Sequence, residues 1–343
     1  MKDKIVNSIK AIIVLSILIV LLWFFVKQID VEKAKYYILH TKLRFTFSIL
    51  FIYPFIYYFR SLRWKYLLGE DGEKVKLINV YSANVIGFAF NYVLPARIGE
   101  FARAYILGKN EDISVGFVFG TVIIERILDL GAMVVFAGVF YLLRPLAFRD
   151  LHPTAKSLEF IKDGSLIAFI LFIILMILFL VIFLFKQKTM DFWGKICTIF
   201  PNKISKGLIN FGDKFIEGII ELFNNKRKIA IIIHSLIIWG LISISYWIAL
   251  IDFGLKVNFI TIIPYIIALL VGASIPTPGM VGGFEALSQL ALTGLYGMNT
   301  NIAAAATIIL HIGLVIITII IATPFILREG LWVFKIAKYK KEK

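Results

Sequence analysis

The chain reads ISVGFVFGTVIIERILDLGAMVVFAGVFYLL from residue 113 to residue 143. A helix that crosses a bilayer needs roughly 20 mainly apolar residues, and this segment exceeds that length. Since a helix rises about 1.5 Å per residue, Glu125, Arg126 and Asp129 fall near the middle of the bilayer. The segment therefore predicts a membrane-spanning helix that carries three charged side chains at mid-depth.

Apolar segments of the same kind recur along the chain. The protein has 343 residues, is 60% hydrophobic and has a mean hydropathy of +0.88. This is more apolar surface than a water-soluble domain of this size can bury, so a bilayer is the expected solvent. Further spans are predicted at residues 5–26, 43–59, 165–185, 229–251 and 302–327.

Two other apolar segments, 77–108 and 259–299, are interrupted by Pro and Gly within residues 91–100 and 274–285. The arms on either side of each break are short for full spans. Irregular backbone at membrane depth is tolerated where protein or water surrounds it, so we expect two re-entrant helical hairpins. The predicted hinge residues at the two tips are Pro95, Gly99, Pro276, Pro278, Gly279 and Gly283.

The expected fold is an all-α integral membrane protein with six spanning helices and two re-entrant hairpins. Residues 1–143 and 165–327 show the same order of spans and hairpin with opposite orientation, which is typical of an inverted-topology repeat within one membrane domain, 1–343. The hairpin tips would then approach each other inside the membrane. A chance similarity in hydropathy is the alternative.

Basic residues set the expected orientation. With the C-terminus in the cytoplasm, 26 of the 37 Lys and Arg residues fall on the cytoplasmic side and 10 on the outer side, as the positive-inside rule requires. We therefore expect a multi-pass protein of the cell membrane with both termini in the cytoplasm.

Residues 203–223 and 30–42 are predicted to be amphipathic surface segments. An interfacial belt is expected at the end of the second span, from Tyr57, Tyr58, Arg60, Arg63 and Trp64.

Charge and residue types limit the class of function. The net charge of +15 is spread over short segments between apolar runs, which favours anionic lipid headgroups over nucleic acid as partners. Cys197 is the only cysteine and no two of the four histidines have metal-ligand spacing, so no metal site is expected. The chain has no Gly-Lys-Ser/Thr phosphate-binding loop, and no cofactor is expected.

Glu125, Arg126 and Asp129 are the main candidate site residues. Glu125 and Asp129 are four residues apart and share a helix face, and Arg126 can bridge to Asp129. Three ionised side chains would hardly persist against lipid, because each costs roughly 2.5 to 3.5 kcal/mol at a helix centre. They therefore face the protein interior or a wet cavity. The alternative to a substrate or coupling site is an ion network that only holds helices together.

Each hairpin break adds candidates. Arg97, Glu100 and Arg103 recur every three residues after Pro95, and a helix N-terminus with two guanidinium groups suits a phosphate. Ordinary cytoplasmic positive charges are the alternative. Asn91, with Asn84, is expected to satisfy backbone groups freed at the first break. Glu285 follows the second break as a coupling or charge-balancing group, or as a simple helix cap.

The sequence resembles the transmembrane domain of lysylphosphatidylglycerol synthases, a flippase-like family. The resemblance rests on residues 91–103, on Glu125-Arg126 with Asp129, and on 275–279 with Gly283 and Glu285, and it covers about residues 10–327. It implies a domain that moves lipids across the membrane. About 15 polar residues follow the last span, so we do not expect the soluble transferase domain of the synthases or lysyl transfer from tRNA.

The favoured function is a lipid translocase, not an enzyme, for an anionic phospholipid or a polyprenyl-phosphate-linked lipid. Arg97, Arg103 and Arg126 would attract the headgroup, together with Asn91 and Glu100. Two alternatives remain: an intramembrane enzyme that modifies lipid headgroups, with Glu100 or Glu125 as general base, and a partner subunit of a membrane glycosyltransferase or lipid-synthesis enzyme.

Overall fold

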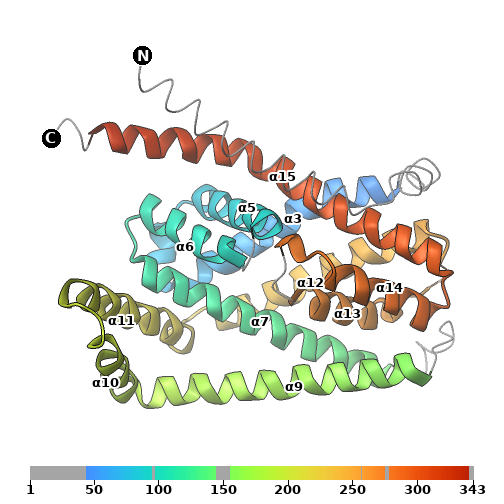
Figure 1. The fold of residues 1–343 in the computed structure, drawn as a ribbon, viewed down its shortest axis with the longest axis horizontal. Helices are drawn as coiled ribbons and strands as arrows, with labels where there is room; N and C mark the ends of the chain where they lie inside the picture. The colour runs from blue at the N-terminus through green and yellow to red at the C-terminus, as the bar shows by residue number, and fades with distance from the viewer. Residues whose placement is uncertain (1–43, 95–96, 144–154, 256, 275–277, 340–343) are drawn as a thin grey trace.

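The computed structural model describes residues 44–94, 97–143, 155–255, 257–274 and 278–339, which fold almost entirely into helices, with no strand among them (Figure 1). The predicted segments 5–26 and 30–42 and the hinge residues Pro95 and Pro276 lie outside the described residues. The helices are α3 (Arg44–Leu67), α4 (Gly69–Lys74), α5 (Leu77–Val93), α6 (Ile98–Asn110), α7 (Val115–Leu142), α9 (Ala155–Leu184), α10 (Lys186–Cys197), α11 (Asn202–Asn224), α12 (Lys228–Asp252), α13 (Ile262–Ser274), α14 (Gly283–Tyr296) and α15 (Thr300–Tyr339), with short 3-10 turns η2 (Phe259–Thr261) and η3 (Pro278–Met280).

The helical character of five predicted spans is confirmed, since α3, α7, α9, α12 and α15 cover them. Among the residues that the structure describes, three helices are long and apolar enough to cross a membrane: Lys162–Leu184, Lys228–Asp252 and Thr300–Glu329. Helix α7 has the length but carries Glu125, Arg126 and Asp129 at its centre. The number of crossings stays a prediction.

Helices α5 and α6 pack against each other as one helical hairpin, and α13 and α14 form a second. In each hairpin, the backbones of the two helices come into close contact at a pair of glycines. A Cβ atom on Gly99 would collide with the carbonyl oxygen of Gly87, and a Cβ atom on Gly272 would collide with that of Gly283. Only glycine permits this close approach of two backbones. Whether the hairpins are re-entrant stays a prediction.

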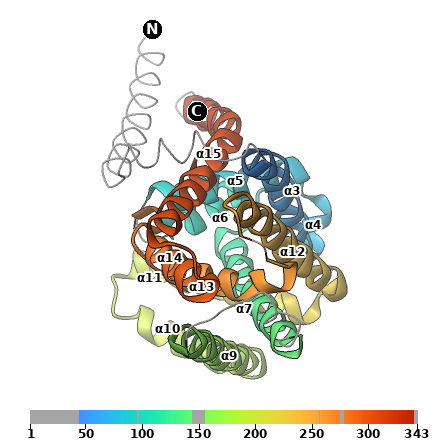
Figure 2. The ribbon, with the colours of Figure 1, turned by 90° about the vertical axis from the view of Figure 1, so that its right-hand side faces the viewer.

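The remaining helices surround the two hairpins. Helix α12 packs along α3, α11 packs along α7, and α15 crosses α5 and α14. Figure 2 shows α15 on one side of the bundle and α9 on the opposite side. Large apolar side chains of α9, from Leu166 to Leu184, are exposed along most of its length, as expected for a helix that faces lipid.

Two hydrophobic cores meet in the middle of the molecule, and polar residues occupy the junction. Along α3, Tyr57 belongs to one core and Trp64 to the other; Arg60 and Arg63 lie between them. Asn84 on α5 and Asp129 on α7 also lie at the boundary between the two cores, because residues before them on each helix belong to one core and residues after them to the other. The polar layer is therefore a feature of several helices and not of α7 alone.

The prediction of an interfacial belt at the end of the second span is wrong for four of its five residues. Arg63 and Trp64 are fully buried, and Tyr57 and Arg60 are nearly so, while Tyr58 is exposed. The reason is helical spacing: residues 56, 60, 63 and 67 lie on one face of α3, and Ile56 and Leu67 on that face are core residues.

The amphipathic segment 203–223 is confirmed as a helix, α11. Its apolar face, with Ile216 and Ile219, is buried against α7, where Gly116 and Gly120 allow the two backbones to approach closely. Helix α11 thereby covers the half of α7 that precedes Glu125.

Candidate functional site

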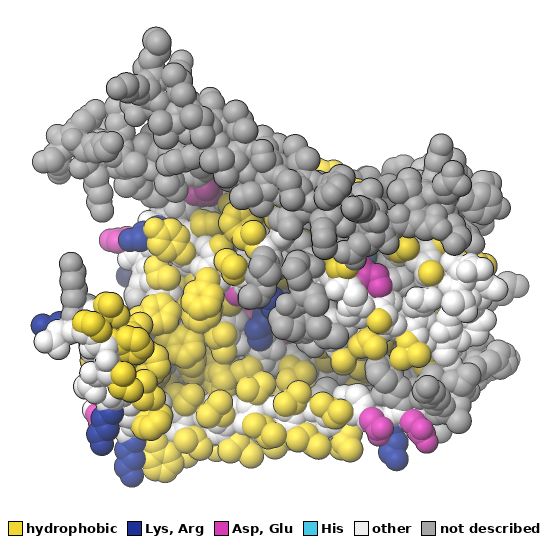
Figure 3. Space-filling model, in the orientation of Figure 1, with side chains coloured by type: hydrophobic (Ala, Val, Ile, Leu, Met, Phe, Trp, Pro, Cys, Tyr) yellow, Lys and Arg dark blue, Asp and Glu magenta, His cyan; other side chains and the backbone are white. Residues whose placement is uncertain are grey.

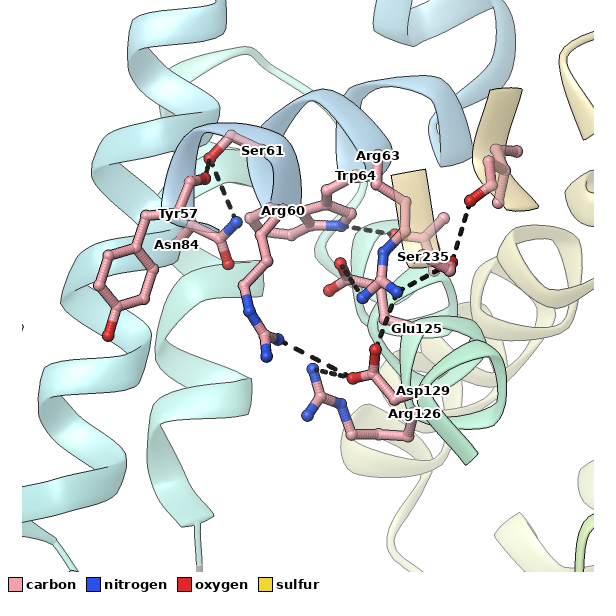
Figure 4. Close-up of polar contacts among 12 residues, drawn as sticks. Tyr57, Arg60, Ser61, Arg63, Trp64, Asn84, Glu125, Arg126, Asp129 and Ser235 are labelled. Carbon is pink, nitrogen blue, oxygen red and sulfur yellow. Dashed lines mark hydrogen bonds and ion pairs between the residues drawn. The ribbon is translucent and has the colours of Figure 1, made fainter. Parts of the chain in front are cut away.

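Arg63 lies at the centre of the polar layer (Figure 4). Its Nη1 atom donates to Asp129 Oδ1 at 2.8 Å and to Ser235 Oγ at 3.1 Å, and its Nη2 atom donates to Glu125 Oε1 at 3.3 Å. Trp239 Nε1 also donates to Asp129 Oδ1, at 3.3 Å. These contacts join α3, α7 and α12, so both carboxylates predicted at mid-depth in α7 are held by an arginine from another helix.

Arg103 extends the network into the first hairpin. Its Nη1 atom lies 2.5 Å from Glu125 Oε2 and donates to Asn84 Oδ1 at 2.9 Å. Its Nε atom donates to Glu100 Oε2 at 2.9 Å. Arg103 is 1% exposed, so this guanidinium group is enclosed by its partners and ties the hairpin to α7.

Arg60 and Arg126 form the accessible edge of the network. Arg126 Nη2 lies 3.3 Å from Asp129 Oδ2, as predicted from their spacing, and Arg60 Nη1 lies 3.9 Å from the same atom. Figure 4 shows both guanidinium groups directed toward the same Asp129 oxygen. The side chain of Arg126 is 29% exposed, far more than Arg63 or Arg103.

A cavity of about 400 Å³ begins at this edge. Its charged lining comes from α3, α6, α7 and the first hairpin tip, and its apolar lining comes from α3, α5, α7, α9, α12, α13, α14 and α15. The polar and charged lining residues are Arg60, Asn91, Arg97, Glu100, Arg126 and Asp129. Figure 3 shows Lys or Arg side chains reaching the surface in the middle of a hydrophobic face.

The two hairpin tips meet at the cavity. Arg97 Nη2 donates to the carbonyl oxygen of Ala273 on α13 at 2.6 Å, and a Cβ atom on Gly279 would lie 2.9 Å from the carbonyl oxygen of Tyr92. Arg97 and Met280 both have the left-handed backbone conformation, with φ of 53° and 62°. Non-glycine residues adopt it at a cost of order 1–3 kcal/mol, and such residues cluster at functional sites.

The second tip has its own polar contact, between a carboxylate and a histidine, beside the cavity. Glu285 Oε2 accepts from the backbone N–H of Gly282 at 2.7 Å, so Glu285 caps α14 as the alternative interpretation predicted. Its other oxygen contacts His311 Nδ1 on α15. The Phe284 ring, which lines the cavity, lies 4.5 Å from the His311 ring, between centroids.

The structure brings some predicted site residues together and separates others. Arg97, Asn91, Glu100, Arg126 and Asp129 line one cavity. Arg103 and Glu125 are enclosed in the ion network, and Glu285 belongs to the second tip. Among the predicted hinges within the described residues, Gly99 and Gly283 lie at the glycine contacts, Gly279 lies against Tyr92, and Pro278 begins η3.

The two asparagines have side-chain partners in and beside the ion network. Asn91 Nδ2 donates to Glu100 Oε1 at 3.4 Å, and Asn84 Nδ2 donates to Ser61 Oγ at 3.2 Å. The asparagines therefore orient the ion network. That they also satisfy backbone groups freed at the break stays a prediction.

Arg60 and Arg63 are the site residues that sequence reasoning missed. The aromatic residues beside them in the sequence predict a position at the membrane interface for both. Their spacing from Ile56 and Leu67 would have placed them on the buried face of α3. Among the described residues, no group of three or more His, Cys, Asp and Glu side chains has the arrangement of a metal site.

Comparison with known proteins places the chain among membrane proteins. The family described as the lysylphosphatidylglycerol synthase TM region matches residues 10–322. A UPF0104 membrane protein of Pyrococcus horikoshii is 24% identical over 87% of this chain and 90% of its own length, and one of Methanocaldococcus jannaschii is 24% identical over 90% and 91%. Glycosyltransferase AglD of Haloferax volcanii is 32% identical over 26% of this chain and 14% of its own length. No solved structure matches.

Proposed function

The chain belongs to the family of the lysylphosphatidylglycerol synthase TM region, and from this premise and the charged cavity we propose that it translocates an anionic lipid across the membrane. The lipid is a phospholipid or a polyprenyl-phosphate-linked lipid. The role is transport and not catalysis, and no cofactor takes part. Both termini lie in the cytoplasm, and six spans and two re-entrant hairpins form an inverted repeat.

One observation carries the proposal: three guanidinium groups, with two carboxylates and Asn91, line one part of a cavity that lies between the two hairpin tips and whose other walls are mainly apolar. Buried ionisable residues in a membrane mark substrate or ion pathways, because they persist there only with partners or water. A lipid headgroup supplies the anion, and the lipid tails remain along apolar walls such as Leu130 and Leu175. Arg126 and Arg97 contact the headgroup in this proposal.

The hairpins supply the movement. Their tips touch through the Arg97 and Ala273 contact, and the left-handed residues Arg97 and Met280 lie at these tips. Breaking this contact on one side of the cavity and remaking it exposes the headgroup site to each face in turn, as in other transporters with broken helices. Arg103 and Glu125 hold the first hairpin on α7, while Glu285 with His311 balances charge or carries a coupling proton at the second.

A role as a partner of a membrane glycosyltransferase is the second candidate. It is favoured by the similarity of part of the chain to glycosyltransferase AglD. In that case exposed surfaces would carry the function and the cavity would not.

The test is lipid movement in liposomes that contain the purified full chain. Acyl-labelled phosphatidylglycerol and a labelled polyprenyl phosphate are supplied in one leaflet, and their arrival in the other leaflet is timed. We expect rates above those of empty vesicles, and a loss of at least about tenfold in Arg126→Gln, since each 1.4 kcal/mol of lost interaction is a factor of ten.

Arg227→Gln is the matched control. Arg227 is an exposed arginine that pairs with Glu73 at 2.8 Å, outside the cavity, and its variant should keep the wild-type rate. Empty-vesicle rates for every anionic lipid would exclude the translocase. Wild-type rates in Arg126→Gln would exclude this cavity as the route.

A further inference from the structure

The charged groups around the cavity do not balance. Within the described residues, five arginines from α3, the first tip, α6 and α7 share three carboxylates, those of Glu100, Glu125 and Asp129. Three arginines satisfy these carboxylates at short distances: Arg63, Arg103 and Arg126. Two positive charges remain.

The two remaining charges belong to Arg60 and Arg97, and both line the cavity. The nearest carboxylate oxygen to Arg60 that forms an ion pair is 3.9 Å away, and this guanidinium group lies 4.7 Å from the centre of the Phe88 ring. Arg97 donates to a neutral acceptor, the carbonyl oxygen of Ala273. Positive charge in excess of its counter-ions is unfavourable in a medium of low dielectric, so the site favours a ligand that brings about two negative charges.

The hydrogen-bonding groups point to the same ligand. Within the described residues, the Nη1 atom of Arg60, the Nε atom of Arg97 and the Nε atom of Arg126 are buried and have no hydrogen-bond acceptor. These donors come from three different elements around one cavity. A phosphate monoester presents three terminal oxygens and carries up to two negative charges, whereas a phosphodiester presents two such oxygens and one charge.

We propose that the cavity selects a lipid phosphomonoester, the headgroup of phosphatidic acid or of a polyprenyl phosphate, over a lipid phosphodiester. This inference rests on the proposed translocase function and names its substrate class. The apolar lining, including Phe88, Leu130 and Leu269, favours a lipid over free phosphate, because the first methylene groups of the tails pack against it.

The experiment compares lipids that differ only in the phosphate. The wild-type full chain is placed in phosphatidylcholine vesicles with traces of acyl-labelled phosphatidic acid, phosphatidylglycerol or phosphatidylcholine that carry the same chains. We expect phosphatidic acid to move about tenfold faster than phosphatidylglycerol, corresponding to about 1.4 kcal/mol of preference. Unlabelled polyprenyl phosphate should compete with phosphatidic acid, since it has the same headgroup.

The pH dependence of lipid movement by the wild-type chain tests the same assignment without a variant. The second proton of a phosphomonoester binds with a pKa of about 6, so movement of phosphatidic acid above the empty-vesicle rate should fall as pH is lowered from 8 to 5. Movement of phosphatidylglycerol should change little. In Arg60→Gln and Arg97→Gln the preference for phosphatidic acid should shrink to about threefold or less, while Arg227→Gln should keep it.

The outcomes distinguish a failure of the translocase function from a failure of the phosphomonoester assignment. If no lipid moves faster than in empty vesicles, the translocase itself fails. If phosphatidylglycerol moves as fast as phosphatidic acid at every pH, the translocase stands and the phosphomonoester assignment is overturned. Inhibition of all movement by millimolar inorganic phosphate would make the cavity a site for a soluble anion and would also overturn the assignment.

Discussion

Arg60 and Arg63 lie three residues apart on α3 but differ in what they contact. Arg63 is fully buried and pairs with Asp129 at 2.8 Å and with Glu125 at 3.3 Å. Arg60 lies 3.9 Å from Asp129 and lines the cavity. The first therefore holds α3 on α7, whereas the second is available to a ligand.

This difference predicts that the two substitutions lower stability by different amounts. Arg63→Met removes the closest partner of Asp129 and one of the two arginine partners of Glu125. Breaking a buried pair in this way costs about 3–5 kcal/mol. Arg60→Met removes an excess charge and should cost less than about 1 kcal/mol. Thermal unfolding in detergent, followed by tryptophan fluorescence, measures both.

Arg227→Met serves as the control for these two variants because its pair with Glu73 is exposed, and such pairs contribute about 0–1 kcal/mol. If Arg60→Met is as destabilising as Arg63→Met, Arg60 belongs to the structural network and the division between the two arginines is wrong.

At the level of the helices, the close packing of the two helices in each hairpin depends on glycine. In α5 and α6 the contact is between Gly87 and Gly99, and in α13 and α14 it is between Gly272 and Gly283. The hairpins lie at corresponding places in the two halves of the chain, which is what an inverted repeat would produce.

Gly99→Ala and Gly272→Ala should therefore lower the unfolding temperature, because the added methyl group meets backbone and cannot be accommodated by a side-chain rotation. Gly138→Ala on α7 and Gly240→Ala on α12 are matched controls with open space at the Cβ position. In helices, alanine is preferred over glycine by about 1 kcal/mol, so the controls should be as stable as the wild type or more so. If the two hairpin variants and the two control variants had the same unfolding temperature, the close glycine contacts would be contradicted.

The contact between α4 and α11 has a pH dependence that can be measured. Glu221 on α11 is partly buried, and this burial, followed by the nearby charges of Glu70 and Asp71, raises the pKa of its carboxyl group. A carboxyl group with a raised pKa in the folded state holds its proton more tightly than in the unfolded state. Stability therefore falls as pH rises from the unfolded value through the folded one.

Glu221→Gln should accordingly raise the unfolding temperature at pH 8 and change it little near pH 3, below the usual pKa of a glutamate carboxyl group, where the wild-type group is mostly protonated in both states. Glu217→Gln, on the same helix, is the control: Glu217 pairs with Lys214 at 2.8 Å and should gain no stability at pH 8. A gain at both pH values would point to the amide itself and not to the charge.

The sequence predicts the helices and the hairpins, but not the ion pairs that join one helix to another. Long apolar runs identified α7, α9, α12 and α15, and Pro and Gly located both hairpins, because these signals are local. The partners of Glu125 and Asp129 were not found, since Arg63 on α3 and Arg103 on α6 reach them only through tertiary packing. Helical spacing on α3 was the one sequence signal that indicated Arg63.

At the scale of the whole molecule, the polar layer separates two hydrophobic cores and opens into the cavity. Arg126 is 29% exposed there, so the network is not closed by its own carboxylates. The cavity meets α9, the helix whose apolar side chains are exposed along most of its length. The translocase proposal therefore predicts that a lipid reaches the charged edge from beside α9.

The most direct test of this account is an electron cryomicroscopy map of the full chain in nanodiscs that contain anionic lipid. We predict density for a lipid phosphate within hydrogen-bond distance of the guanidinium groups of Arg60, Arg97 and Arg126, with tails directed toward α9. A closed, dry cavity in which these arginines contact only protein groups, with lipid phosphates confined to the two rims of the protein, would contradict it.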